Sequence, residues 1–147
     1  MSKTVILIDD NEDDLLFAQI SVRRCGHPAD LKEFFRAQDA LAFLASGELV
    51  KPALVLLDIN MPVMNGFDFL DAYERLPMAV RANVMVVMLT SSIDERDRQR
   101  AFSYDSVKDY MRKPIERSQV AALLQLLDAL ESRNLASDRS GAAFPPL

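Results

Sequence analysis

Apolar runs of strand length alternate along the chain with longer segments of mixed polarity. Three of these runs are apolar throughout, namely TVILI at 4–8, ALVLL at 53–57 and VMVVML at 84–89. Runs of this kind are typical of strands that are covered on both faces. Two less apolar runs, Asp30–Phe35 and Val107–Met111, bring the number of predicted strands to five.

Segments of helix length separate the predicted strands. They are Asn11–Cys25, Ala37–Ala45, Gly66–Leu76, Asp94–Phe102 and Glu116–Leu130. Strands that alternate with helices predict an α/β fold with a parallel sheet and helices on both faces. Because crossover connections are right-handed, we expect a doubly wound, flavodoxin-like sheet of five parallel strands in the order 2-1-3-4-5.

The chain of 147 residues has the length of one domain with a single core. We expect that domain to cover residues 1–131. Residues 132–147 lose the apolar periodicity and gain Ser, Gly and Pro, which predicts a flexible C-terminal tail.

Charge and composition narrow the choice of partners and of compartment. A net charge of −5 argues against binding to nucleic acid or to an anionic membrane. No apolar run approaches the roughly 18 residues that cross a bilayer, and the N-terminus turns acidic too soon for a signal peptide. With one cysteine, the chain cannot form an internal disulfide. We therefore expect a cytoplasmic protein.

Polar residues follow the predicted strands at the points where each strand ends. They are Asp9 and Asp10, Asp58, Thr90 with Ser91 and Ser92, and Lys113 with Pro114. Because the carboxyl ends of parallel strands meet at one edge of a sheet, we expect these side chains to converge there. The sequence thus predicts a polar site at this edge.

Three carboxylates at one place need a cation, and Mg²⁺ with carboxylate and water ligands fits best. A hydroxyl from Thr90 and the ammonium of Lys113 are suited to holding the oxygens of a phosphoryl group. This set of groups indicates phosphoryl transfer to the carboxylate of Asp58.

Four stretches together resemble the receiver domain of the bacterial two-component response regulators. They are LIDD at 7–10, LLDINMPVMNG at 56–66, VMLTSS at 87–92 and DYMRKPI at 109–115. The resemblance covers residues 3 to about 131 and, with no output domain expected, implies a stand-alone regulator. The short tail and SYDSVKDY at 103–110 are similar to the small regulators that pair with bacterial phytochrome kinases.

The resemblance implies that Asp58 is the phosphoacceptor, which takes a phosphoryl group from a phosphohistidine of a sensor kinase. Asp10 is implied to bind Mg²⁺ directly and Asp9 mainly through water. Asp58 and the backbone carbonyl of Asn60 complete the implied protein ligands. Such a protein is a switch that assists its own phosphorylation and dephosphorylation rather than an enzyme, and its output passes through protein–protein contacts.

The resemblance also implies roles around the phosphoryl group. Thr90 and Ser91 are implied to contact the phosphoryl group, and Lys113 to pair with it. Tyr110 is the implied aromatic switch, which turns inward when Thr90 shifts. The Lys113–Pro114 peptide bond is implied to be cis. Family members often carry a glycine four residues before the switch, where this chain has a serine, so we expect the turn before the fifth strand to be reshaped.

The acids of DDNEDD at 9–14 divide into two groups. Asp9 and Asp10 are assigned to the site by their place at the end of the first strand. Glu12, Asp13 and Asp14 fill the first turn of the following helix, where the macrodipole favours negative charge. With Asn11 as the N-cap, Asp14 is expected to close the cap rather than to serve the site.

Two other functions use similar residues. Phosphatases with an Asp nucleophile need a second acid two residues after the nucleophile, where this chain has Asn60. A degenerate receiver that serves only as a binding module is disfavoured by the complete set of Asp9, Asp10, Asp58, Thr90 and Lys113.

The last predicted helix is more apolar than packing on one side requires. At about 100° per residue, its apolar positions spread over roughly 220°, where packing on one face needs only about 100°. They are Val120, Leu123, Leu124, Leu126, Leu127, Ala129 and Leu130. The part of the arc around Ala122, Leu126 and Ala129 is expected to be exposed or to contact a partner, and we expect a homodimer through it.

Overall fold

The computed structural model describes residues 3–143 and the side chains of residues 3–131. The five strands are β1 (Lys3–Ile8), β2 (Ala29–Phe34), β3 (Ala53–Asp58), β4 (Val84–Thr90) and β5 (Val107–Arg112). The helices are α1 (Glu12–Arg23), α2 (Ala37–Ala45), α3 (Gly66–Tyr73), α4 (Met78–Arg81), α5 (Glu95–Phe102) and α6 (Arg117–Ala143). All five strands and five of these helices occupy the predicted places.

The sheet is parallel throughout, with the strand order β2-β1-β3-β4-β5. The predicted fold class and strand order are therefore confirmed. The register places Asp58 beside Leu89 of β4 and Thr90 beside Arg112 of β5. The chain reverses its direction of winding at β1 and β3, so the carboxyl ends of these two central strands flank the crevice where ligands bind in such sheets.

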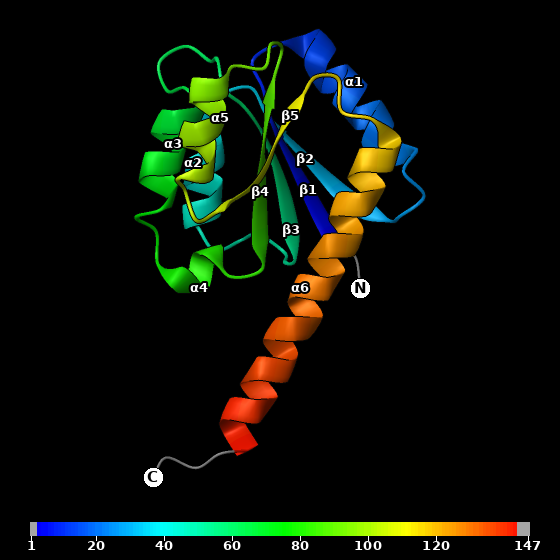
Figure 1. Cartoon of the computed structure of the whole chain (residues 1–147), viewed down its shortest axis with the longest axis vertical. Helices are drawn as coiled ribbons and strands as arrows, with labels where there is room; N and C mark the ends of the chain where they lie inside the picture. Colours follow the sequence, from blue (N-terminus) through cyan, green and yellow to red (C-terminus); the bar gives the residue numbers. More distant parts are fainter. Residues whose placement is uncertain (1–2, 144–147) are drawn as a thin grey trace.

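The two faces of the sheet bury separate cores because successive side chains of a strand point to opposite faces. In β3, Val55 and Leu57 pack with α2, α3 and α5, whereas Leu54 and Leu56 pack with α1 and α6. Figure 1 shows this three-layer arrangement, with α1 and α6 on one side of the sheet and the other helices on the opposite side. The three central strands β1, β3 and β4 are almost fully buried, which explains why their sequences read as continuous apolar runs, whereas the edge strands β2 and β5 are partly exposed.

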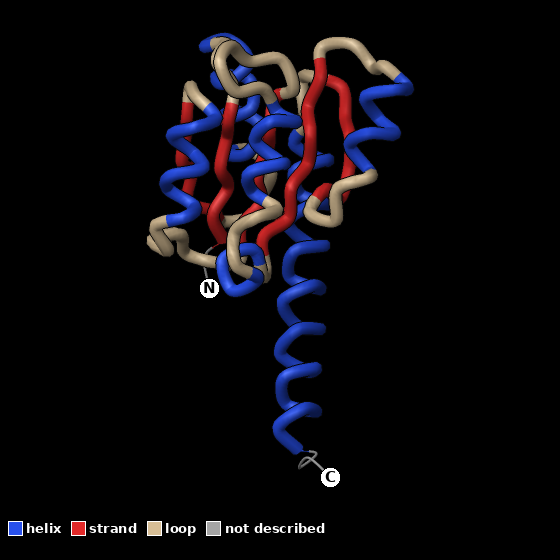
Figure 2. The backbone as a smooth tube through the Cα atoms, turned by 90° about the vertical axis from the view of Figure 1, so that its left-hand side faces the viewer, coloured by secondary structure: helices blue, strands red, loops and turns tan. Residues whose placement is uncertain are grey.

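Helix α6 is longer than predicted, and its second half projects away from the body of the domain (Figures 1 and 2). The predicted end at Leu130 is wrong. After Leu130 the apolar period fades, but no proline occurs before Pro145, and Ala, Leu and Arg support a helical backbone. Flexibility of residues 132–147 stays a prediction, and residues 144–147 lie outside the described residues.

Helix α4 was not predicted, because Pro77 marks the end of α3 in the sequence. In the structure Pro77 is the N-cap of this single turn, a place where the missing N–H of proline costs no hydrogen bond. Across residues 3–143, no helix combines the length and the apolar character that a membrane span requires.

Candidate functional site

Three carboxylates converge where β1 and β3 end. Asp9, Asp10 and Asp58 each place one carboxylate oxygen within 4.8 Å of the others. Asp9 and Asp58 are buried, and Asp10 is exposed. Hard oxygen ligands that are close together and repel one another are suited to holding a divalent cation such as Mg²⁺. The residues present therefore fit the predicted cation.

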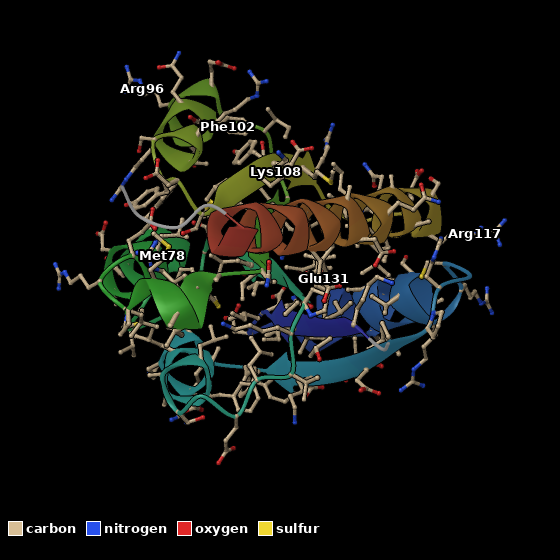
Figure 3. The ribbon with its side chains drawn as sticks, turned by 90° about the horizontal axis from the view of Figure 1, so that it is seen from below. Met78, Arg96, Phe102, Lys108, Arg117 and Glu131 are labelled. Atoms are coloured by element: carbon tan, nitrogen blue, oxygen red, sulfur yellow. The ribbon has the colours of Figure 1, made fainter. Side chains whose placement is uncertain are left out.

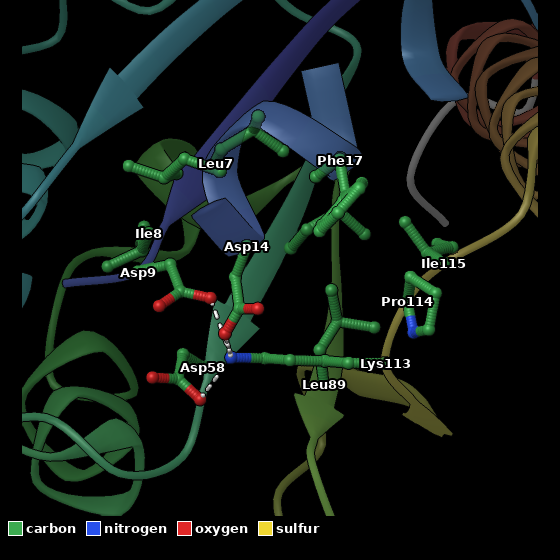
Figure 4. A pocket seen from close by; sticks show the side chains of 13 residues that line it. Leu7, Ile8, Asp9, Asp14, Phe17, Asp58, Leu89, Lys113, Pro114 and Ile115 are labelled. Carbon is green, nitrogen blue, oxygen red and sulfur yellow. Dashed lines mark hydrogen bonds and ion pairs between the residues drawn. The ribbon is translucent and has the colours of Figure 1, made fainter. Parts of the chain in front are cut away.

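Lys113 reaches into this acidic group from the loop after β5. Its Nζ lies 2.7 Å from Oδ2 of Asp9 and 3.0 Å from Oδ1 of Asp58. A third carboxylate, that of Asp14, lies 2.9 Å from the same nitrogen. Figure 4 shows the lysine side chain extended toward all three acids. The backbone N–H of Lys113 also donates to the carbonyl of Thr90 at 2.7 Å, which fixes the loop beside β4.

The electrostatics of the site raise the pKa values of both Asp58 and Lys113. Burial and the charge of Asp9 raise the pKa of Asp58 to about 6, although the hydrogen bond from Lys113 acts in the opposite direction. Burial alone would lower the pKa of Lys113, but hydrogen bonds to the three carboxylates outweigh burial and raise that pKa above its ordinary value. One ammonium thus offsets only part of the negative charge at this edge.

Thr90 and Tyr110 connect the site to the loop before α5. The hydroxyl of Thr90 donates to the carbonyl of Ser92 at 2.8 Å and accepts from its N–H at 3.2 Å. The hydroxyl of Tyr110 accepts from the N–H of Asp94 at 3.2 Å and donates to its carbonyl at 3.4 Å. Tyr110 already lies inward, with 6 % of its surface exposed. Ser91 is exposed at the start of this loop.

Sequence comparison matches residues 5–125 to the response regulator receiver domain. The chain belongs to the response regulator receiver family. An uncharacterized response regulatory protein of Staphylococcus epidermidis is 30 % identical over 117 residues, which are 77 % of this chain and 44 % of that protein. The alkaline phosphatase synthesis transcriptional regulatory protein PhoP of Bacillus subtilis is 24 % identical over 86 % of this chain and 49 % of its own. This receiver thus spans about half the length of the curated relatives that it matches.

Solved structures of receiver proteins have the same fold. A response regulator receiver protein from Dyadobacter fermentans is 30 % identical, with a TM-score of 0.77 over 86 % of this chain and 98 % of that chain. The bacteriophytochrome response regulator RtBRR is 29 % identical, with a TM-score of 0.70 over 86 % of this chain and 78 % of that chain. Receivers act with sensor kinases in two-component signalling, so this chain is a signalling domain.

The loop after β3 carries the remaining predicted groups of the receiver site. Asn60 is exposed two residues beyond Asp58, and a role for its carbonyl in holding a cation stays a prediction. At the end of this loop, the N–H of Gly66 donates to the carbonyl of Ile59 at 2.8 Å. A Cβ at position 66 would lie 2.6 Å from the carbonyl oxygen of Asp58, so only glycine fits there. The Lys113–Pro114 peptide bond on the other side of the site is cis.

Asp14 was assigned to the helix start alone, and this assignment is wrong. Its backbone N–H does donate to Oδ1 of Asn11, the N-cap, at 3.0 Å. Its side chain does not close the cap, because the N–H of Asn11 donates to Oδ1 of Asp9 instead. The carboxylate of Asp14 contacts Lys113. The acidic first turn predicted the helix start, but apolar periodicity does not specify which way the third helical residue points.

The turn before β5 has Ser106 where receivers often have glycine, and the side chain of Ser106 forms a hydrogen bond. Its hydroxyl donates to Oε2 of Glu74 at 2.6 Å, and the same carboxylate pairs with Arg81 at 3.2 Å. A glycine could not make this contact. The serine therefore ties the turn to the end of α3 and to α4.

The predicted interface residues all lie on the exposed side of α6. Ala122 and Ala129 are exposed, and Leu126 is 44 % exposed. Leu126 and Ala129 line a groove of about 370 Å³ together with Met78 and Lys108. Figure 3, seen from below, shows Met78 and Lys108 on either side of the projecting end of α6. The structure thus leaves the predicted arc open.

Proposed function

We propose that Asp58 is the phosphoacceptor of this receiver in a two-component phosphorelay. The observation that carries the proposal is the contact of 3.0 Å between Lys113 Nζ and Asp58 Oδ1 inside a group of three carboxylates. An oxygen of Asp58 forms the new bond to phosphorus, and the bond from phosphorus to the histidine nitrogen of the kinase breaks. The electron pair of that bond remains on the imidazole.

The residues around Asp58 would then stabilise the phosphoryl group. Asp9, Asp10, Asp58 and the carbonyl of Asn60 would hold Mg²⁺, which neutralises charge on the phosphoryl oxygens. Lys113 pairs with one phosphoryl oxygen. For Thr90 to donate to another, its hydroxyl has to leave the carbonyl of Ser92, with which it is now bonded.

That change provides the route for the signal. Release of the Ser92 contact alters the loop between β4 and α5, where Tyr110 holds the backbone of Asp94. The surface formed by α5, β5 and α6 then changes its affinity for protein partners. The similarity to RtBRR supports a kinase of the bacterial phytochrome type as the phosphoryl donor.

The test is labelling of the purified protein with Mg²⁺ and acetyl phosphate or phosphoramidate, read by intact mass. Wild type should gain one phosphoryl group, and Asp58→Asn should gain none because its amide is not a nucleophile. Asp30→Asn is the matched control, since Asp30 is an exposed acid on β2. Equal labelling of wild type and Asp58→Asn would overturn the assignment.

We also propose that two copies associate through α6. The exposed Ala122, Leu126 and Ala129 and the adjoining groove support this interface. Leu126→Glu places a charge at its centre and should make a dimeric wild type monomeric in sedimentation. Leu16→Glu is the control, because Leu16 is similarly exposed on α1. Identical monomeric behaviour of wild type and both variants would remove the proposal.

A further inference from the structure

The ammonium group of Lys113 has more carboxylate partners than the predicted site supplies. Its Nζ lies 2.7 Å from Asp9, 2.9 Å from Asp14 and 3.0 Å from Asp58. An ammonium group carries three N–H donors. The number of donors thus matches the number of carboxylates around Nζ, and Asp14 is one of the three.

Asp14 differs from the other two carboxylates in its relation to a cation. Asp9 and Asp58 belong, with Asp10, to the group of acids whose oxygens approach one another within 4.8 Å. Asp14 does not belong to that group. A cation at this place would compete with Lys113 for the oxygens of Asp9 and Asp58, and it would leave the carboxylate of Asp14 to the lysine.

The backbone around Asp14 is fixed by the start of α1. The N–H of Asp14 donates to Oδ1 of Asn11, and the N–H of Asn11 donates to Oδ1 of Asp9, both at 3.0 Å. The cap thus sets the position of Asp14 relative to the end of β1. The side chain of Lys113, in contrast, is a flexible chain of four carbons that depends on contacts at its end for its orientation.

We propose that Asp14 is a positioning residue, which keeps the ammonium of Lys113 beside Asp58 when Asp9 and Asp58 turn to a divalent cation. The inference rests on the proposed function of Asp58 as phosphoacceptor. It gives α1 a part in preparing the site, because the first turn of this helix carries the carboxylate partner of Lys113 that lies outside the group of acids expected to hold the cation.

If the charge of Asp14 acted only by stabilising α1, removal of the charge of Asp13 would have the same effect. Asp13 is an exposed acid in the same first turn. The favourable interaction of both acids with the helix macrodipole is similar. Asp13→Asn is therefore the matched control for Asp14→Asn, which keeps the size of the side chain and removes its charge.

The first measurement is the ¹H–¹⁵N signal of the Lys113 ammonium, which is visible when the group is held and protected from exchange with water. Without Mg²⁺, all three proteins should show the signal, because Asp9 and Asp58 remain available. With saturating Mg²⁺, wild type and Asp13→Asn should keep it, and Asp14→Asn should lose it. Retention of the signal in Asp14→Asn would overturn the proposal.

The second measurement is the affinity for beryllofluoride, a mimic of the phosphoryl group, at saturating Mg²⁺. Loss of one charged hydrogen bond predicts an affinity about fivefold weaker for Asp14→Asn. Asp13→Asn should bind as wild type does, and an equal loss in both variants would overturn the proposal. The ammonium signal needs no phosphorylation, so a failure of Asp58 to be labelled is distinguishable from a failure of this inference.

Discussion

The two edges of the sheet hold polar clusters that differ in their ratio of hydrogen-bond donors to carboxylates. At the carboxyl edge, the single ammonium of Lys113 serves three carboxylates. At the amino edge, the single carboxylate of Glu74 accepts from both Arg81 and Ser106. The carboxylate of Glu74 thus has a cationic and a hydroxyl partner from the protein, whereas the carboxyl edge keeps an excess of negative charge. The excess of negative charge thus lies at the edge where a cation and a phosphoryl group are expected.

Among variants at the two edges, Gly66→Ala at the carboxyl edge should cause the largest loss in the free energy of unfolding. The new Cβ would lie 2.6 Å from the carbonyl oxygen of Asp58 and 3.0 Å from Cα of Ile59, so backbone must move. We expect a loss of about 3 kcal/mol in the free energy of unfolding, measured by urea denaturation.

Gly47→Ala is the control for this prediction. Gly47 has a φ of +79° but nothing within 4 Å of a new Cβ, so only backbone strain is added there. The loss should be about 1 kcal/mol. Equal losses in the two variants would show that crowding at Asp58 is unimportant.

The next largest effect should come from Glu74→Ala at the amino edge. The variant leaves Arg81 and Ser106 without their shared acceptor, and the paired side chains of Glu74 and Arg81 are only about one-fifth exposed. We expect a loss of about 2 kcal/mol in thermal or urea unfolding. Mg²⁺ should not change this loss. The exposed Glu48→Ala should cost less than about 0.5 kcal/mol.

The smallest effect should be a gain in stability from Asp58→Asn without Mg²⁺. Folding raises the pKa of Asp58 to about 6, from about 3.9 in an unfolded chain. Between these values the folded state binds more protons, so the free energy of unfolding falls as the pH rises through the window. Asparagine does not ionise and avoids the fall. We expect Asp58→Asn to be about 1.5 kcal/mol more stable than wild type at pH 7.5.

The pH series carries its own control. Near pH 4 wild type and Asp58→Asn should have nearly equal stability, because Asp58 is protonated in the folded state there. Addition of Mg²⁺ at pH 7.5 should stabilise wild type more than Asp58→Asn. A difference that does not depend on pH would contradict the electrostatic origin of the effect.

The strands and their convergent ends could be predicted because one rule determines both. A strand buried on two faces reads as an apolar run, so its end is visible in the sequence, and Asp9, Asp58 and Thr90 stand at such ends. Asp14 lies on a helix, where the acidic first turn fits two orientations equally well. The structure chooses the one that reaches Lys113.

The length of α6 and the groove beside it were harder to predict for another reason. Apolar periodicity reports where a helix packs and not how far its backbone continues. In α6 the apolar periodicity fades after Leu130, whereas the helical backbone continues to Ala143. The groove beside Leu126 depends on the unpredicted α4, so the sequence predicted the exposed arc but not the hollow next to it.

Helix α6 is long enough that a small tilt at its first turn would displace its far end. The helix begins at Arg117, close behind the cis bond from Lys113 to Pro114, and it runs for 27 residues. At about 1.5 Å per residue, this is a rod of about 40 Å, so a tilt of about 5° at its first turn moves the far end by about 3.5 Å. A small tilt at the first turn would therefore reach the scale of a side chain at the far end of the helix.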